Sequence, residues 1–309
     1  MDLRVVAALL AVVFLAAAEG SDRLAVVAPS GPYLQQVPPG LKPVLFAEGI
    51  VSTDVNDVGC SFTPDGRELY FGRFEPGRGY TILVMKDTSS GWTEPRIAPY
   101  SSNYSEIDPF ITGDGRRCFF ISKRPPETGA ARSSVYHVWV TDRRGDGWGS
   151  PHRLGPTVNS PERQLFPTLA DDGTIVFGSN RSGGHGGCDI YSASPDGSDF
   201  KTAVNLGPAV NSAGDETDAL IAPDGSFLVF TAVGREDGYG SGDLYVSFKN
   251  PAGSWSPAMN MGETINTPSS EFCPTLSPDG RYFLFTSRRA GSDDIYWVDA
   301  SVIDSLRDD

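Results

Sequence analysis

The chain has few of the residues that usually carry redox, metal or nucleophilic chemistry. Its 309 residues include four cysteines and three histidines, and no G-x-S-x-G segment occurs. The absence of that nucleophile elbow leaves serine-hydrolase chemistry without a candidate nucleophile. The cysteines have no close paired spacing, so the sequence predicts neither a disulfide framework nor a thiolate metal site. They are Cys60, Cys118, Cys188 and Cys273. We expect no catalytic residue, no metal and no cofactor.

Positive charge is also scarce. Lysine and arginine together number 25 against 39 aspartates and glutamates, which gives a formal net charge of −14. An acidic surface repels phosphate backbones and anionic lipid headgroups. Nucleic acid and membrane surfaces are therefore poor candidates for partners.

Long apolar runs are limited to one, from Val5 to Ala18. It follows Arg4 and ends in three alanines, which fits a small-residue cleavage site. The run is short for a membrane span, so we interpret residues 1–18 as a secretory signal peptide, with an uncleaved anchor as the alternative. Since no second such run follows, we expect a soluble, monomeric mature protein, not inserted in a membrane, that is periplasmic or secreted.

Turn residues, in contrast, are abundant and periodic. One four-residue turn occurs five times, as TPDG at 63–66, TGDG at 112–115, ADDG at 170–173, APDG at 222–225 and SPDG at 277–280. Successive turn aspartates are separated by 49, 58, 52 and 55 residues. Asp followed by Gly suits a tight hairpin turn whose glycine adopts a left-handed conformation. An apolar strand follows each turn, a second strand follows after a loop, and the residues ahead of the turn keep one register.

Each repeat therefore reads as four short antiparallel strands with a period near 50 residues, which is typical of a β-propeller blade. The sequence predicts an all-β fold with five blades over residues 40–300. The fifth repeat lacks its last strand, and residues about 40–50 supply it, so the N-terminal strand should pair into the last blade and close the ring. Residues 19–39 would form an N-terminal extension and 301–309 a C-terminal tail.

Two of the repeats carry a family resemblance. PTLSPDGRYFLFTSRRAGSDDIYWVD in blade 5 and PTLADDGTIVFGSNRSGGHGGCDIYSA in blade 3 resemble the PD40, or TolB-like, relative of the WD40 repeat. Blades 1, 2 and 4 depart from that pattern. The resemblance covers about residues 40–300. It implies a propeller and an exported binding scaffold of the bacterial cell envelope, although one fold hosts many functions.

Polar residues recur at the start of each first strand, eight residues before the turn aspartate: Asp57, Glu106, Gln164, Glu216 and Glu271. Asp108 and Asp218 follow two residues later, on the same side of the strand by alternation. Arginines recur in the loops between second and third strands, namely Arg124, Arg181 and Arg289, with Arg73 and Arg235 displaced by one or two positions. Antiparallel order places all of these on one face of the ring, near the channel mouth.

These residues admit two interpretations. They could form a charged mouth that binds a peptide, a glycan or a cation, or each acid could pair with an arginine and hold the blades together. We expect the protein to bind an envelope protein or peptide as a rigid scaffold. The alternative is a carbohydrate-active enzyme or glycan-binding module that uses the carboxylates. Acids without arginine partners would favour the alternative, and fully paired acids would favour the scaffold. A purely structural part of a larger assembly is a third possibility.

Overall fold

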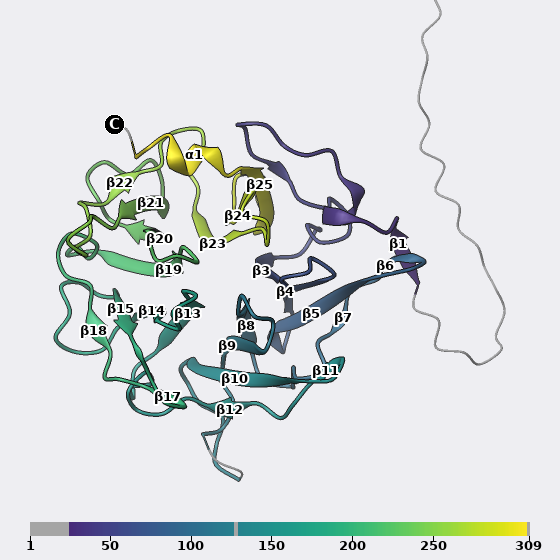
Figure 1. The fold of residues 1–309 in the computed structure, drawn as a ribbon, viewed down its shortest axis with the longest axis horizontal. Helices are drawn as coiled ribbons and strands as arrows, with labels where there is room; N and C mark the ends of the chain where they lie inside the picture. Colours follow the sequence, from purple (N-terminus) through teal and green to yellow (C-terminus); the bar gives the residue numbers. More distant parts are fainter. Residues whose placement is uncertain (1–24, 127–128, 308–309) are drawn as a thin grey trace, which may run out of the picture.

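The computed structural model describes residues 25–126 and 129–307, and these form five small antiparallel sheets around a common axis (Figure 1). The prediction of an all-β, five-bladed propeller is confirmed. The signal peptide predicted at residues 1–18 lies outside the described residues, and the domain boundaries proposed from the sequence stay predictions.

Each blade contains four strands, which follow sequence order from the axis outward in blades 1 to 4. The innermost strands are β3 (Asp57–Phe62), β8 (Glu106–Ile111), β13 (Gln164–Leu169), β19 (Asp215–Ile221) and β23 (Glu271–Leu276). The second strands are β4 (Glu68–Glu75), β9 (Arg117–Ser122), β14 (Ile175–Ser179), β20 (Phe227–Val233) and β24 (Tyr282–Ser287). The third strands are β5 (Gly79–Thr88), β10 (His137–Arg144), β15 (Asp189–Ala193), β21 (Asp243–Phe248) and β25 (Asp294–Asp299). The outermost strands are β7 (Arg96–Ile97), β12 (His152–Arg153), β18 (Val204–Asn205), β22 (Met259–Asn260) and β2 (Val44–Leu45).

The outer strand of the last blade comes from the N-terminal part of the chain. Strand β2 pairs antiparallel with β25, with Val44 opposite Trp297 and Leu45 opposite Tyr296. Blade 5 is also bonded to blade 1, since the backbone N–H of Gly59 donates to Thr286 Oγ1 at 3.1 Å. The two ends of the repeat array therefore meet in one sheet and one interface.

Short elements complete the structure. Strands β6 (Gly91–Thr93), β11 (Gly147–Trp148), β16 (Pro195–Asp196) and β17 (Asp199–Phe200) lie at the corners after the third strands. Strand β1 (Val26–Ala28) pairs with β6, a 3-10 turn η1 covers Pro32–Gln35, and a short helix α1 covers Ser301–Asp304. Within the described ranges no helix is long and apolar enough to cross a membrane.

The turn glycines behave as the sequence predicts. Those of the five repeated turns all have a left-handed backbone, with φ between 68° and 84°: Gly66, Gly115, Gly173, Gly225 and Gly280. In blade 1 the turn carboxylate of Asp65 accepts hydrogen bonds from the hydroxyl of Thr63 and the backbone N–H of Arg67. This local bonding fixes the hairpin that sets the register of the first two strands.

The hydrophobic core is divided into five clusters, and each lies between two neighbouring blades. One contains Tyr70 of blade 1 and Phe120 of blade 2, and another contains Val229 of blade 4 and Phe283 of blade 5. A four-stranded blade has two apolar faces and cannot bury either alone, so every blade depends on both of its neighbours. All four cysteines are free and buried.

The N-terminal arm, which we define as residues 25–36, lies against the junction of blades 5 and 1. Tyr33 packs edge-to-face on Phe62 and Tyr282, with ring centroids 5.6 and 5.1 Å apart. Tyr33, Leu34 and Gln35 have φ values of 50°, 57° and 58°. Three consecutive left-handed residues cost roughly 1–2 kcal/mol each, so the burial of Leu34 and the aromatic contacts must offset that strain.

Candidate functional site: two rings of equivalent residues

The five residues predicted at the strand starts form a ring that is completely buried. Each has 0% of its surface exposed. We call this set the pairing ring: Asp57, Glu106, Gln164, Glu216 and Glu271. A buried carboxylate is costly unless cations and hydrogen-bond donors surround it, so its partners decide what it does.

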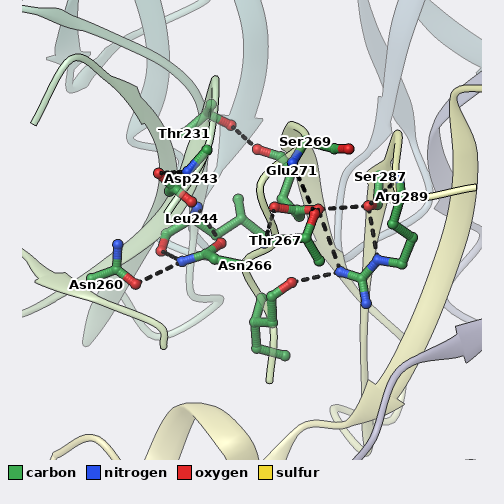
Figure 2. A network of polar contacts seen from close by, with 12 residues as sticks. Thr231, Asp243, Leu244, Asn260, Asn266, Thr267, Ser269, Glu271, Ser287 and Arg289 are labelled. Atoms are coloured by element: carbon green, nitrogen blue, oxygen red, sulfur yellow. Dashed lines mark hydrogen bonds and ion pairs between the residues drawn. The ribbon is translucent and has the colours of Figure 1, made fainter. Parts of the chain in front are cut away.

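Blade 5 shows the arrangement in full (Figure 2). Glu271 accepts hydrogen bonds from the backbone N–H and hydroxyl of Thr267, at 2.8 and 2.7 Å, and from the hydroxyl of Ser287 at 2.6 Å. The guanidinium of Arg289 lies 3.5 Å from the same carboxylate and also donates to the backbone carbonyl of Ile265 at 2.6 Å. The carboxylate thus ties the loop that enters the blade to the loop after its second strand.

Three other blades repeat this pattern. Glu216 pairs with Arg235 at 3.0 Å and accepts from the backbone N–H of Ser212 at 2.8 Å. Asp57 pairs with Arg73 at 2.6 Å, and Glu106 pairs with Arg124. The arginines displaced in sequence reach the same kind of partner as the others, so every acid of the pairing ring contacts an arginine of its own blade.

Blade 3 is the exception because its ring member is neutral. The side-chain amide of Gln164 donates to Ser160 Oγ at 2.8 Å, and its buried Oε1 has no hydrogen-bond partner. Arg181 still donates to a backbone carbonyl, that of Val158, and its guanidinium lies over the rings of Phe177 and Tyr191. Burial lowers the pKa of Arg181, and among the described residues no carboxylate forms an ion pair with it.

Asparagines next to the pairing ring join neighbouring blades. Asn266 accepts from the backbone N–H of Leu244 at 2.8 Å and donates to the carbonyl of the same residue at 2.9 Å (Figure 2). Asn211 and Asn159 make the same two bonds to Ile190 and Val138 of their preceding blades. The asparagine side chain therefore bonds both backbone groups of one residue on the third strand of the preceding blade. This requirement explains why the asparagine keeps a fixed distance from the turn aspartate in the sequence.

A second ring lies on the axis, six residues before each turn aspartate. We call it the axial ring: Gly59, Asp108, Phe166, Asp218 and Cys273. All five have a left-handed backbone, with φ between 45° and 58°. The pairing of each innermost strand with the second strand is shifted at this point. The repeat therefore builds a β-bulge into every blade, which turns this side chain away from its predicted neighbour in the pairing ring.

Members of the axial ring from different blades contact one another. The thiol of Cys273 donates to Oδ1 of Asp108 at 3.8 Å and lies 4.0 Å from Oδ2 of Asp218. A Cβ atom on Gly59 would lie 3.6 Å from that sulfur, so the backbone of Gly59 also lies close to Cys273. Asp108, Cys273 and Phe166 are 4–6% exposed, whereas Asp218 is half-buried.

The axial carboxyls are protonated more easily than ordinary aspartates. Burial raises the pKa of Asp108 well above its usual range, and the nearby charge of Asp218 raises it further. Burial also raises the pKa of Asp218, to about 6. Burial likewise raises the pKa of the Cys273 thiol, which keeps it protonated. Among the described residues, neither Asp108 nor Asp218 forms an ion pair with lysine or arginine.

The structure thus separates residues that the sequence analysis had grouped. Glu106 and Asp108 were expected on one side of a strand, but Glu106 faces Arg124 of its own blade and Asp108 faces blade 5. Sequence reasoning missed Cys273, Phe166 and Gly59 as companions of the two aspartates. The shared offset from the turn aspartate would have identified them. Whether any predicted residue binds a ligand stays a prediction.

The fold and these rings define a five-bladed β-propeller, and solved structures share its architecture. It is similar to TolB from Acinetobacter baumannii, at 14% identity and a TM-score of 0.50 over 82% of this chain and 54% of TolB. A TolB structure from Agrobacterium tumefaciens gives 17% and 0.52 over 79% and 76% of the two chains. An endo-arabinase from Bacteroides thetaiotaomicron gives 11% and 0.54 over 84% and 96%.

These similarities show a TolB-like propeller fold. The chain spans about half the length of the Acinetobacter TolB that it matches. No family model matches the sequence, and no curated protein sequence matches it either.

Proposed function

We propose that this chain is an exported propeller scaffold that binds a protein or peptide partner in the cell envelope. The proposal of export, to the periplasm or the medium, depends on the signal peptide predicted at residues 1–18. The proposal of protein binding is supported by the burial and arginine pairing of the acids predicted from the sequence. It is in keeping with the shared fold of the TolB structures, although a fold hosts many functions.

The observation that carries the proposal is the pairing ring. Its four carboxylates are fully buried, and each is held by an arginine and by donors of the preceding loop. Groups used in this way stabilise the ring and are withdrawn from solvent. Recognition is then left to the loops that differ between blades, which a rigid frame presents in fixed positions.

A glycan-active propeller is the second candidate, and the axial ring favours it. Within the described ranges Asp108 and Asp218 form no ion pair, and pairs of carboxyls whose pKa values are pushed apart are typical of glycosidases. Such enzymes place the two carboxyls about 5–5.5 Å or about 6.5–9.5 Å apart on either side of the sugar bond. Against this candidate, Asp108 is only 6% exposed, so a sugar would have to displace its neighbours to reach it.

A pull-down from envelope extract tests the scaffold directly. The full-length chain is compared with a Phe74→Ala/Tyr239→Ala variant, because these exposed aromatics flank the loops after the second strands of blades 1 and 4. We expect the native chain to retain one protein in stoichiometric amount, and the variant to show whether this face binds it. Glu216→Ala and Glu271→Ala are unsuitable probes because both carboxylates hold the fold together.

A parallel assay addresses the glycan candidate. The native chain and an Asp218→Asn variant are incubated with plant and bacterial polysaccharides, and new reducing ends are measured. Release by the native chain alone, with no protein retained from the extract, would replace the scaffold by the enzyme.

A further inference from the structure

The face of the ring that carries the repeated turns, opposite the pairing ring, contains a well on the propeller axis. Its volume is about 270 Å³, and all five blades line it. Apolar side chains from every blade form its wall: Phe62, Phe110, Ile111, Leu169, Leu220, Ile221 and Leu276. The well is smaller than the roughly 300–1,000 Å³ of pockets that take drug-sized molecules. It therefore suits one large side chain better than a whole small molecule.

Three hydroxyls in the wall already have hydrogen-bond partners. Ser61 Oγ accepts the backbone N–H of Ile111 at 3.0 Å, and the hydroxyl of Thr112 donates to Asp114 at 2.6 Å. Ser277 donates to Asp279 at 2.7 Å and accepts the backbone N–H of its own hairpin. A sugar placed here would lose its hydrogen bonds to water and find few replacements, whereas an apolar group would gain by burial.

The rim is open and charged on one side. At equivalent positions, blades 1, 4 and 5 carry Pro64, Pro223 and Pro278, while blades 2 and 3 carry Gly113 and Asp171. Asp171 is exposed, is the only charged residue lining the well, and among the described residues its carboxylate takes part in no ion pair. A positively charged group beside the well would meet a free opposite charge.

On the side of Asp171, a short groove extends the well outward from the axis. This groove of about 380 Å³ between blades 2 and 3 shares Thr112, Gly113, Leu169 and Asp171 with the well, and Asp114 and Arg117 also line the groove. A ligand could therefore place one side chain in the well and extend outward past Asp171.

The N-terminal arm of the chain already occupies part of this face. At the junction of blades 5 and 1, residues of the N-terminal arm lie beside the equivalent turns, at Pro64 and Pro278. There Tyr33 inserts against Phe62 and Tyr282 and contacts Asp279. Burial raises the pKa of the phenol, and the hydrogen bond to Asp279 raises it further. A turn of the chain with a large anchoring side chain next to a turn carboxylate is thus already bound once on this face.

We propose that the axial well and the groove between blades 2 and 3 bind an extended peptide segment of a partner protein. One large apolar side chain fills the well, and a lysine or arginine next to it meets Asp171. This inference rests on the proposed scaffold function and assigns the surface through which the scaffold works.

A library of random peptides displayed on phage is the probe. Selection is performed on the full-length chain, and each enriched peptide is then tested by calorimetry against Gly113→Phe and Asp171→Lys. The first variant covers the well, where the only atom that its Cβ would crowd is the flexible carboxylate of Asp171, at 2.9 Å. The second reverses the rim charge. Asp196→Lys, on the exposed hairpin β16–β17, is the matched charge control.

We expect peptides with a large apolar residue next to lysine or arginine, whose affinity falls at least about 10-fold in both variants, about 1.4 kcal/mol, and not in the control. Peptides that bind both variants unchanged, or a library that yields no binder, would overturn this site. A protein still retained in the pull-down would then leave the scaffold intact, with its partner on another face.

Discussion

The pairing ring and the axial ring both contain carboxyl groups, but the surroundings of these groups are opposite. Glu271 and Glu216 lie against arginines and the donors of the entering loop, whereas Asp218 and Asp108 meet each other around an uncharged thiol. The pairing ring has an acid in four of the five blades. In the axial ring only two of the five residues are of the same type, the aspartates of blades 2 and 4. A residue that recurs in every repeat serves the geometry that recurs, and a residue that varies is free for a role particular to one blade.

The largest effect should come from removing one acid of the pairing ring. Glu271→Ala leaves the half-buried Arg289 without its fully buried carboxylate partner, and breaking a buried ion pair costs about 3–5 kcal/mol. Gln164→Ala in blade 3 removes only a neutral amide and should cost about 1–2 kcal/mol. Urea denaturation followed by circular dichroism measures both. Equal losses in the two blades would show that the charge of the pairing ring contributes nothing.

Removing a carboxylate from the axial ring should instead stabilise the folded protein. The pKa of Asp218 is raised from 3.8 to about 6, so the folded state holds its proton more tightly than the unfolded chain. The free energy of unfolding therefore falls as pH rises from about 4 to about 6, by up to about 3 kcal/mol at roughly 1.4 kcal/mol per pKa unit. Asp218→Asn should reduce this dependence, leaving the part due to Asp108, and should stabilise the protein at pH 7 by about 1–3 kcal/mol.

Denaturation curves at several pH values between 4 and 8 test this prediction. Asp224→Asn is the control, because its exposed turn carboxylate has a lowered pKa and should lose stability instead. A variant of Asp218 that is less stable than the native chain at pH 7 would mean that its carboxylate is held by a partner other than Cys273.

The smallest effect should come from completing the pairing ring. Gln164→Glu places a carboxylate where Oε1 has no partner, in the blade whose Arg181 forms no ion pair with any described residue. Both side chains bond to Ser179 Oγ. We expect a gain of about 1 kcal/mol at neutral pH, lost as the new acid is protonated at low pH. Thermal unfolding at pH 7 and pH 4 measures it. A loss at pH 7 would show that the desolvation of the added charge exceeds its attraction to the arginine.

Sequence reasoning predicted the fold well because the repeat fixes it several times over. Five Asp-Gly turns with one register leave little choice of strand order, and the predicted position of the last outer strand agrees with the pairing of Val44 and Leu45. The candidate site was harder to predict. Strict alternation places Asp108 beside Glu106, and only the β-bulge with its left-handed residue separates them.

Alternation also says nothing about burial. Both Gln164 and Glu271 look like channel residues in the sequence, yet neither has any exposed surface in the folded chain. The well on the opposite face is invisible in the sequence for a related reason. It is formed by ordinary apolar strand residues and distinguished only by Gly113 and Asp171 in place of proline.

Strand β2 is synthesised long before its partner β25. Ser52 likewise waits for Ile295, 243 residues later, before its hydroxyl can bond to that backbone. Contacts this distant in sequence are slow to form, because a long loop must be ordered before they contribute stability. Closure of blade 5 should therefore be the last event in folding, and a nascent chain released before Asp294 would keep an open, adhesive sheet edge.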